Sequence, residues 1–221
     1  MKINAIKGAS DQNKEEWLAE RLGGITATEI KTLFLADEAG NLDQAIQEMV
    51  IKKIINASTP DNKFFIWGRE REPIIAKKIQ NMFPSFKLEE EHCVYHSLED
   101  YKFMASPDMI GEKDDNPFLV EIKTSKNDLM DEQVLDKTGY FYQCQWQMFV
   151  TQTVECWLVF EQHSGIWQEG ADGIERPSEV YPLQYIGFVR NDEVIGKMKH
   201  IANLFLSAYL PAISWGIAKP Q

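Results

Sequence analysis

The sequence of 221 residues has few cysteines, no long apolar runs and a deficit of positive charge. Its three cysteines, Cys93, Cys144 and Cys156, are scattered and include no Cys-x-x-Cys pair. They form neither a disulfide framework nor a four-thiolate cluster, which is typical of a protein in a reducing cytoplasm. No apolar run approaches the roughly 20 residues of a membrane span, and the first 17 residues resemble no export signal. We therefore expect a cytoplasmic protein without a membrane segment.

Lysine and arginine number 23 against 34 aspartates and glutamates, which gives a formal net charge of −11. This balance excludes a protein that coats nucleic acid with a uniformly basic surface. It allows an enzyme that grips DNA in a local basic groove and holds divalent cations with carboxylates. Apolar residues make up 44% of the chain and internal repeats are absent, so we expect a single globular domain over residues 1–221.

The pattern of apolar and turn-forming residues divides this domain into two parts. Residues 1–83 are predicted to be mainly helical, and Asn13 with Glu16 and Thr26 with Glu29 form two candidate capping boxes. Residues 84–221 are predicted to form a mixed-sheet catalytic core. Its expected strands cover 92–105, 118–124, 154–161 and 184–190, and the turn-rich residues 111–117 are expected to join the first two as a β-hairpin. Its expected helices cover 129–152 and 191–210, and residues 162–182 are expected to form a long surface loop. The order of these elements favours an α/β (α+β) fold with a mixed sheet flanked by helices.

The sharpest chemical feature is Ser-Pro-Asp at 106–108, followed after twelve residues by Glu-Ile-Lys at 121–123. Side chains alternate along a strand, so Glu121 and Lys123 share one face, and a hairpin brings Asp108 beside Glu121. Two carboxylates and a strand carbonyl offer hard oxygen ligands to Mg²⁺ or Mn²⁺. A neighbouring lysine can orient or help deprotonate a metal-bound water for in-line attack on a phosphodiester. The pattern predicts a nuclease site, although both strings also occur by chance in unrelated chains.

Three further segments accompany these strings in a fixed order. They are WLAERLGGITATEI at 17–30, WGRERE at 67–72 and YFYQCQWQM at 140–148. Together with SPD and VEIK, they closely resemble the phage λ exonuclease and YqaJ-type viral recombination exonuclease family, from about residue 17 to residue 160. The resemblance implies a PD-(D/E)xK restriction-endonuclease-like nuclease fold. It also implies a Mg²⁺-dependent 5′→3′ exonuclease that digests one strand of linear double-stranded DNA and leaves 3′ single-stranded tails.

The same resemblance implies cofactors, partners and a cellular setting. Two Mg²⁺ ions are expected per site, with Mn²⁺ as a substitute, and a homotrimer is the expected assembly. The 3′ tails would serve a partner protein that anneals single strands in recombination. The gene would belong to a phage or prophage, and the protein would act in the cytoplasm of the bacterial host.

The resemblance also assigns the chemistry to individual residues. Asp108, Glu121 and the carbonyl of Ile122 are the expected metal ligands, and Glu72 matches an acidic residue near the second metal. The catalytic set consists of Asp108, Glu121, Lys123 and Gln143. In this family glycine usually follows the aspartate of the first string, whereas this chain has methionine there, so the turn is expected to differ while the carboxylate stays.

A second group of residues is expected to bind DNA and its terminal 5′ phosphate. The group comprises Arg21, Thr26, Thr28, Phe65 and Gln145, with Phe65 at the place of an apolar wedge that splits the end base pairs. Independently of the resemblance, the helix that begins after Thr26 offers free N–H groups to an anion, and Arg21 adds a bidentate partner. A cap and a surface arginine are the plainer alternative. The family arginine expected near residues 37–38 has no basic counterpart here.

Two other functions compete with the exonuclease. One is a restriction-type or repair endonuclease of the same PD-(D/E)xK chemistry, although the repair nucleases that carry a metal cluster need four cysteines. The other is a non-catalytic protein that binds DNA ends and keeps only the fold. The intact set of Asp108, Glu121 and Lys123 argues against the second alternative.

Overall fold

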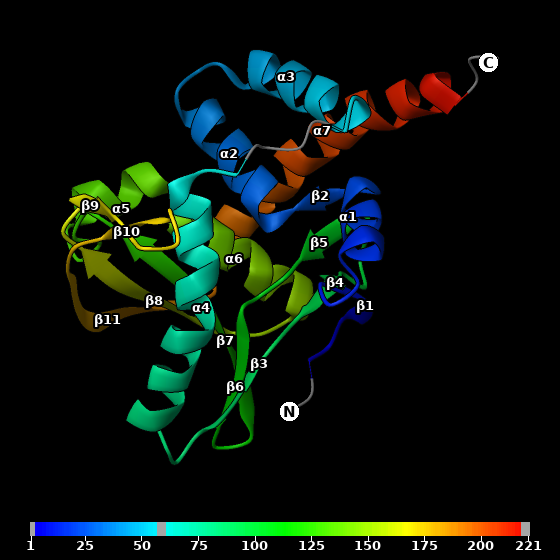
Figure 1. Ribbon diagram of the computed structural model, residues 1–221. Coiled ribbons are helices and arrows are strands. Elements are labelled where there is room, and N and C mark those ends of the chain that lie inside the picture. Colours follow the sequence, from blue (N-terminus) through cyan, green and yellow to red (C-terminus); the bar gives the residue numbers. More distant parts are fainter. Residues whose placement is uncertain (1–2, 57–60, 218–221) are drawn as a thin grey trace.

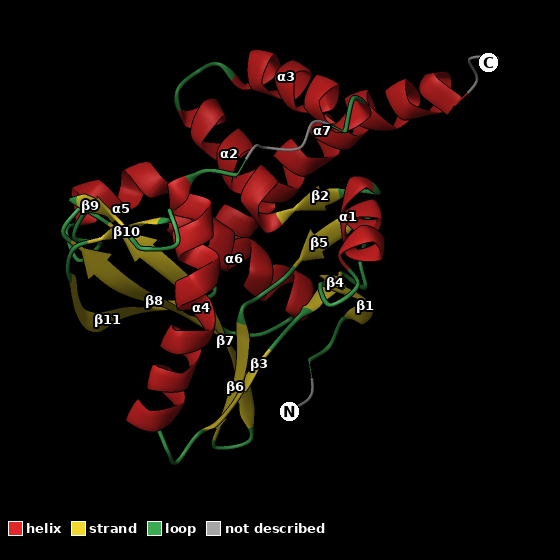
Figure 2. Ribbon diagram, viewed as in Figure 1, coloured by secondary structure: helices red, strands yellow, loops and turns green. Residues whose placement is uncertain are grey.

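The structure is a computed structural model that describes residues 3–56 and 61–217, with side chains described as far as residue 214 (Figure 1). The helices are α1 Lys14–Leu22, α2 Ala27–Glu38, α3 Leu42–Ile54, α4 Lys63–Met82, α5 Glu132–Thr138, α6 Tyr140–Thr151 and α7 Asp192–Ile217. The strands are β1 Ile6–Ser10, β2 Ile25–Thr26, β3 Lys87–Glu90, β4 Cys93–His96, β5 Phe103–Ala105, β6 Met109–Lys113, β7 Asn116–Ser125, β8 Glu155–His163, β9 Trp167–Glu169, β10 Glu175–Pro177 and β11 Val180–Val189. This arrangement confirms the predicted α/β class, with mixed sheets flanked by helices (Figure 2).

The larger sheet has five strands in the order β11-β8-β7-β6-β3. Its centre is β7, which pairs antiparallel with β6 as a hairpin and parallel with β8. In the hairpin Met109 lies opposite Val120, so the next pair outward sets Asp108 opposite Glu121. A hairpin that contains Glu121 is therefore confirmed and brings together the two strings that carry the acidic residues, but its first strand is β6 and not the predicted 92–105.

Two apolar cores lie on opposite faces of this sheet. On one face, α4 packs Ile75 and Ile79 against Val120 and Ile122 of β7. On the other face, Leu119 belongs to the main core, to which α2, α6 and α7 contribute. Side chains alternate along β7, so Glu121 and Lys123 point to the same side as Leu119, where α6 lies. Strand geometry thus directs the polar side chains toward the buried helix α6.

Helix α6 is enclosed between the five-stranded sheet, the strands β4 and β5, and the helices α2 and α7. Every residue from Gln143 to Thr151 is buried. Trp146 fills the centre, has no exposed surface and donates a hydrogen bond from Nε1 to the carbonyl of Met104 at 3.1 Å. A helix without a solvent face places its glutamines inside the protein, where each amide needs a partner.

The smaller sheet has four strands in the order β1-β4-β5-β2, and it corrects two predictions. Residues 92–105 form two strands, β4 and β5, rather than one strand of the site hairpin. Near the start of the chain, which was expected to be helical, β1 and β2 are strands of this sheet. Both are short, and their stability comes from pairing with distant residues, which local patterns do not reveal.

The pairing of β2 with β5 fixes where α2 begins. Ile25 lies opposite Phe103, and its N–H donates to the carbonyl of Lys102 at 2.8 Å. The preceding residue, Gly24, passes so close to that carbonyl that a Cβ on it would lie 2.0 Å from the oxygen. A residue with a side chain does not fit there, so glycine holds the first turn of α2 against the segment that leads to Asp108.

The stretch 162–182 is not the plain loop that its composition predicts. It contains the two-stranded hairpin β9–β10, followed by the start of β11. Arg176 of β10 binds Glu70 of α4 through two hydrogen bonds of 2.8 and 2.7 Å, and Trp167 packs edge-on against Phe64. These contacts hold the hairpin against the first half of α4 (Figure 1).

Helix α7 crosses α2 and α3 and ends beyond the body of the molecule (Figure 1). Its Phe205 and Tyr209 are buried in the main core, and the hydroxyl of Tyr209 donates to the carbonyl of Leu22 at 2.7 Å. None of the helices that the structure describes combines the length and the apolarity that crossing a bilayer requires.

Candidate active site

Asp108 and Glu121 stand side by side at the end of the β6–β7 hairpin. The backbone N–H of Ile122 donates to Oδ2 of Asp108 at 2.6 Å, which fixes the direction of this carboxylate. Glu121 is only 1% exposed. A hairpin that pairs the first acidic string with the second therefore produces the two-carboxylate arrangement that the sequence predicts.

Three side chains bind the carboxylate of Glu121. Lys123 and the Nε2 amide of Gln143 both contact its Oε1, and Nε2 of Gln147 donates to Oε2 at 2.5 Å. The two glutamines lie one turn apart on α6 and present their amides to the sheet. With three donors, the buried carboxylate is satisfied and has a fixed orientation.

One polar atom of this network has no partner. Oε1 of Gln143 is buried and accepts no hydrogen bond within the described parts of the chain. A buried acceptor without a donor lowers the stability of the fold by about 1–3 kcal/mol, so this unpaired oxygen beside Glu121 marks a strained point of the site. Solvent does not reach this oxygen in the present arrangement, so a donor can bind it only after the surrounding side chains shift.

The acidic groups of the site perturb one another. Burial and the charge of Glu121 raise the pKa of Asp108 well above its ordinary value, although Lys123 opposes this shift. The pKa of Glu72 is also raised, first by burial and then by the charge of Glu121, while the charge of Lys123 opposes the shift. For Lys123, burial lowers the pKa, but the charges of Glu121 and Asp108 outweigh burial and raise it. Concentrated negative charge of this kind favours any cation that enters the site.

The donor set fits a hard divalent cation. The ammonium of Lys123 contacts the carboxylate of Glu121, and it lies 3.1 Å from the carbonyl oxygen of Ile122. A positive charge therefore already lies between two of the expected metal ligands. Asp108 adds a third oxygen from the opposite strand. Within residues 3–56 and 61–217, no three His, Cys, Asp or Glu side chains converge into a ready-made metal cluster. The set is thus two carboxylates and a main-chain carbonyl, which suits Mg²⁺ or Mn²⁺ better than a transition metal that prefers nitrogen or sulfur.

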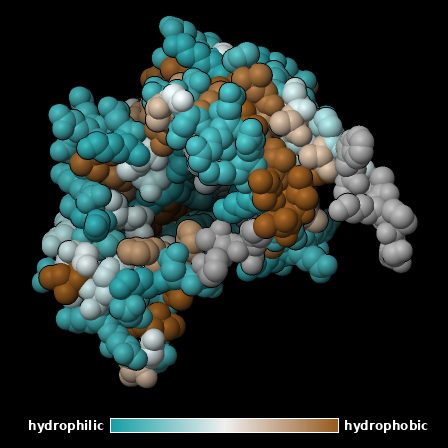
Figure 3. All heavy atoms as spheres, turned by 90° about the horizontal axis from the view of Figure 1, so that it is seen from above, coloured by the Kyte–Doolittle hydropathy of each residue, from teal (hydrophilic) through white to brown (hydrophobic). Residues whose placement is uncertain are grey.

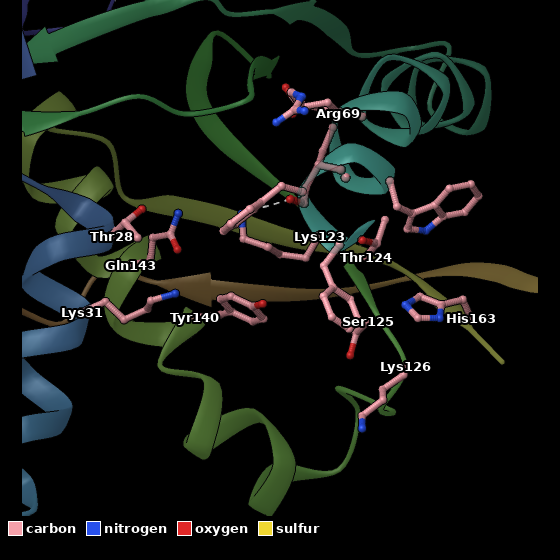
Figure 4. A pocket seen from close by; sticks show the side chains of 16 residues that line it. Thr28, Lys31, Arg69, Lys123, Thr124, Ser125, Lys126, Tyr140, Gln143 and His163 are labelled. Carbon is pink, nitrogen blue, oxygen red and sulfur yellow. Dashed lines mark hydrogen bonds between the residues drawn. The ribbon is translucent and has the colours of Figure 1, made fainter. Parts of the chain in front are cut away.

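The site opens into a cleft of about 520 Å³ between α2, α4 and the end of β7. Lys123 and Gln143 border the cleft (Figure 4). Glu72 and Phe65 of α4 also line it. Phe65 is 47% exposed, as an apolar residue at the rim of a binding cleft can be. The face shown in Figure 3 is hollowed between parts with mainly hydrophilic surfaces. Of the predicted metal-site residues, Glu72 and Ile122 therefore line the cleft with Phe65, whereas Asp108 and Glu121 lie behind it, hydrogen-bonded to Ile122 and to Lys123 and Gln143.

A second cavity of about 510 Å³ lies between α1, α2 and α3. Arg21, Lys52 and Lys53 line it, and Thr28 borders both this cavity and the cleft. The guanidinium carbon of Arg21 lies 4.2 Å from the centre of the Trp17 ring. The same guanidinium donates a hydrogen bond to Oγ of Ser106 at 3.2 Å. Burial lowers the pKa of Arg21, an effect that two nearby carboxylates oppose. The predicted phosphate-binding pair, Arg21 and Thr28, therefore shares one cavity next to the cleft, which Glu29 and Glu48 also line.

Two predicted contacts need correction. Gln145 has no exposed surface, its Nε2 donates to the carbonyl of Val189 at 2.9 Å, and its Oε1 accepts from the N–H of Asn191 at 2.7 Å. It fastens α6 to the end of β11 and does not reach DNA. Thr26 is buried as the N-cap of α2, and both its hydroxyl and its N–H donate to Glu29. The capping box is confirmed, and it leaves no hydroxyl of Thr26 for a phosphate.

Sequence reasoning missed Gln147, which binds Glu121 as closely as Gln143 does. The signal was visible, because Gln143 and Gln147 are four residues apart and lie on one helix face. It also missed Lys53, whose buried ammonium binds Glu29 at 2.7 Å and the carbonyl of Arg21 at 3.0 Å. This lysine holds the main chain of Arg21 in place from α3.

A family model that describes a YqaJ-like viral recombinase domain matches residues 16–154. The chain belongs to this family. The matched range contains the two acidic strings, α4 with Glu72, and α6 with both glutamines that bind Glu121. No curated protein matches the sequence.

Solved structures show where else this fold occurs. The alkaline exonuclease LHK-Exo from Laribacter hongkongensis is 21% identical, with a TM-score of 0.64 over 91% of this chain and 95% of that one. A phage-related exonuclease from Haemophilus somnus 129PT is 16% identical, with a TM-score of 0.65 over 86% of this chain and 95% of that one. The fold is thus the PD-(D/E)xK-like fold of λ-exonuclease-type nucleases, as the sequence predicts.

Proposed function

We propose that this chain is a metal-dependent 5′→3′ exonuclease that digests one strand of linear double-stranded DNA. The observation that carries the proposal is the grouping of Asp108, Glu121 and Lys123 at a cleft, in a chain of a viral recombinase family. Both similar structures described above are named exonucleases, and LHK-Exo has also been crystallised with dAMP, a deoxynucleoside monophosphate. Stepwise digestion of DNA would release products of that class.

We assign Mg²⁺ to the site, with Mn²⁺ as a substitute and two ions as the expected number. Asp108, Glu121 and the carbonyl of Ile122 would hold the first ion, and Glu72 would face the second from α4. When bound, the metal activates a water and withdraws charge from the phosphodiester. Because metal ligation would occupy Glu121, the ammonium of Lys123 would be free to bind the attacking water or a phosphate oxygen.

The protein residues around this centre position the reacting groups. Gln143 and Gln147 fix Glu121 from α6, and the N–H of Ile122 fixes Asp108. Fixed oxygen ligands need no reorganisation when charge builds up on the phosphorus, which is the main electrostatic contribution of an enzyme site.

The adjoining cavity would hold the 5′ terminal phosphate. Arg21 and Thr28 line it, and Lys52 adds positive charge, whereas the charge of Lys53 is paired with Glu29. Because Thr28 also borders the cleft, a strand held by its end in this cavity would lead directly to Asp108 and Glu121. Phe65, exposed at the cleft, would separate the end base pairs as the strand enters.

The remaining partners follow from the family. A homotrimer around the DNA would allow a chain of net charge −11 to stay on its product without a strongly basic surface. The 3′ single-stranded tail would pass to an annealing protein for recombination, in the cytoplasm of a bacterium that carries the phage or prophage.

Strand polarity is the experimental test of this function. A linear duplex that carries a radioactive 5′ phosphate should release its label as mononucleotide from the start of the reaction. The same duplex labelled at a 3′ end should keep that label in long single strands until late. Early release of the 3′ label instead would contradict the proposed polarity, and release of both labels in short oligonucleotides would favour an endonuclease.

A further inference from the structure

Among the described residues, Lys31 is one of four cationic side chains that line the cleft, with Arg69, Lys123 and Lys126, and the family motifs do not account for it. It lies on α2, one helical turn after Thr28, and its side chain points into the cleft toward Tyr140 (Figure 4). The ammonium lies 4.6 Å from the centre of the Tyr140 ring, and the ammonium of Lys123 lies 5.6 Å from the same centre. Two lysines, from α2 and β7, therefore face one ring from two elements.

The stem of Lys31 is fixed by packing. It packs so closely on Gly139 that a Cβ added to this glycine would lie only 2.7 Å from the Cγ of Lys31. Gly139 also has a φ of +66°, which favours glycine. Leu35 packs at the same point. The apolar part of the side chain is thus held between α2 and the start of α6, and its direction into the cleft is set by the fold.

The charge of Lys31 is not neutralised by the protein. In the part of the chain that the structure describes, no carboxylate oxygen lies within 4.0 Å of its ammonium, whereas the buried Lys53 of the next cavity is paired with Glu29. Burial and the charge of Lys123 lower the pKa of Lys31 to about 8, although Glu121 opposes this shift. An unpaired, partly desolvated cation beside another cation costs stability unless an anion joins it.

We infer that Lys31 binds a backbone phosphate of the DNA strand that enters the cleft, beside Lys123 and Tyr140. The inference rests on the proposed function, because DNA supplies the anion. Lysine contacts a phosphate as a point charge, so the contact is independent of base sequence. Each phosphate neutralised on duplex DNA releases counterions and steepens the salt dependence of binding by about 0.9.

The test compares Lys31→Met, which keeps the apolar stem, with Lys31→Arg, which keeps the charge. Binding of a 5′-phosphorylated duplex is measured in Ca²⁺ over a series of salt concentrations. Lys31→Met should lower the slope of log K against log salt by about one and weaken binding about tenfold at low salt. Lys31→Arg should restore most of the slope. Lys197→Ala, which removes an exposed lysine of α7 paired with Glu193, should match the wild type.

The outcomes separate the inference from the function on which it rests. A wild type that digests linear duplex while Lys31→Met keeps the wild-type slope would overturn the inference alone. The same holds if Lys31→Arg behaves like Lys31→Met, because the effect would then come from packing. A wild type that neither binds nor digests linear duplex would overturn both.

Discussion

Replacing Asp108 by alanine is expected to abolish the Mg²⁺-dependent digestion of linear duplex while leaving its binding in Ca²⁺ nearly unchanged. The substitution removes one of two carboxylates at the site, together with the acceptor of the Ile122 N–H. Binding should persist because phosphate contacts elsewhere in the cleft supply most of the affinity. The measurement is the release of acid-soluble nucleotide from a linear duplex, with a mobility-shift assay for binding.

Lys123→Ala should act at the same step. Its ammonium is the group within reach of a reacting water or phosphate oxygen, so the expected loss in kcat is roughly 10²- to 10⁴-fold with little change in KM. Lys113→Ala, at the exposed far end of the same hairpin, is the matched control and should digest at the wild-type rate. Near wild-type digestion by Asp108→Ala or by Lys123→Ala would remove the nuclease assignment from this site.

The second large effect concerns the end of the substrate. A duplex with a 5′ phosphate is expected to be digested about tenfold faster than its 5′-hydroxyl twin, because the phosphate holds the strand forward in the cavity of Arg21 and Thr28. A charge-assisted hydrogen bond contributes about 1.5–3 kcal/mol. We expect a rate difference near the low end of this energy range because residues 37–38 offer no cation to the phosphate. The carboxylate of Glu38 instead accepts a hydrogen bond from the hydroxyl of Tyr142 at 3.0 Å.

Arg21→Ala separates phosphate binding from structure. If Arg21 binds the terminal phosphate, its loss should slow the phosphorylated substrate to about the rate of the hydroxyl twin, and leave the twin almost unchanged. Arg21 also donates to Ser106, two residues before Asp108, so a purely structural role would slow both substrates equally. Equal slowing, or equal rates on both ends in the wild type, would contradict the phosphate cavity.

The sequence was sufficient to predict those parts of the site that depend on neighbouring residues. Strand alternation gave the common face of Glu121 and Lys123, and the turn-rich link before Glu121 gave the hairpin that places Asp108. The capping box at Thr26 follows from a spacing of three residues. Features of this kind are set within one hairpin or one helical turn, where periodicity and turn chemistry decide the outcome.

What the sequence could not show depends on long-range packing. The spacing of four residues puts Gln143 and Gln147 on one face of α6 and Gln145 on another, but only the packing around α6 decides that the first face meets Glu121 while Gln145 binds backbone. Residues 92–105 form two strands that pair with each other around a turn at 97–102, and the outer partners of both strands, β1 and β2, come from the start of the chain. The β9–β10 hairpin is held by an ion pair between residues 106 positions apart in sequence.

One measurement tests the central claim most directly, namely that this site digests DNA from its ends. The purified protein is incubated with Mg²⁺ and an equal mixture of a linear duplex and a covalently closed circular plasmid of a different size. The account predicts progressive loss of the linear duplex while the circle stays intact, and no digestion of either when EDTA is present. Nicking or linearisation of the circle at a comparable rate would contradict the exonuclease, and an intact linear duplex would contradict any nuclease function.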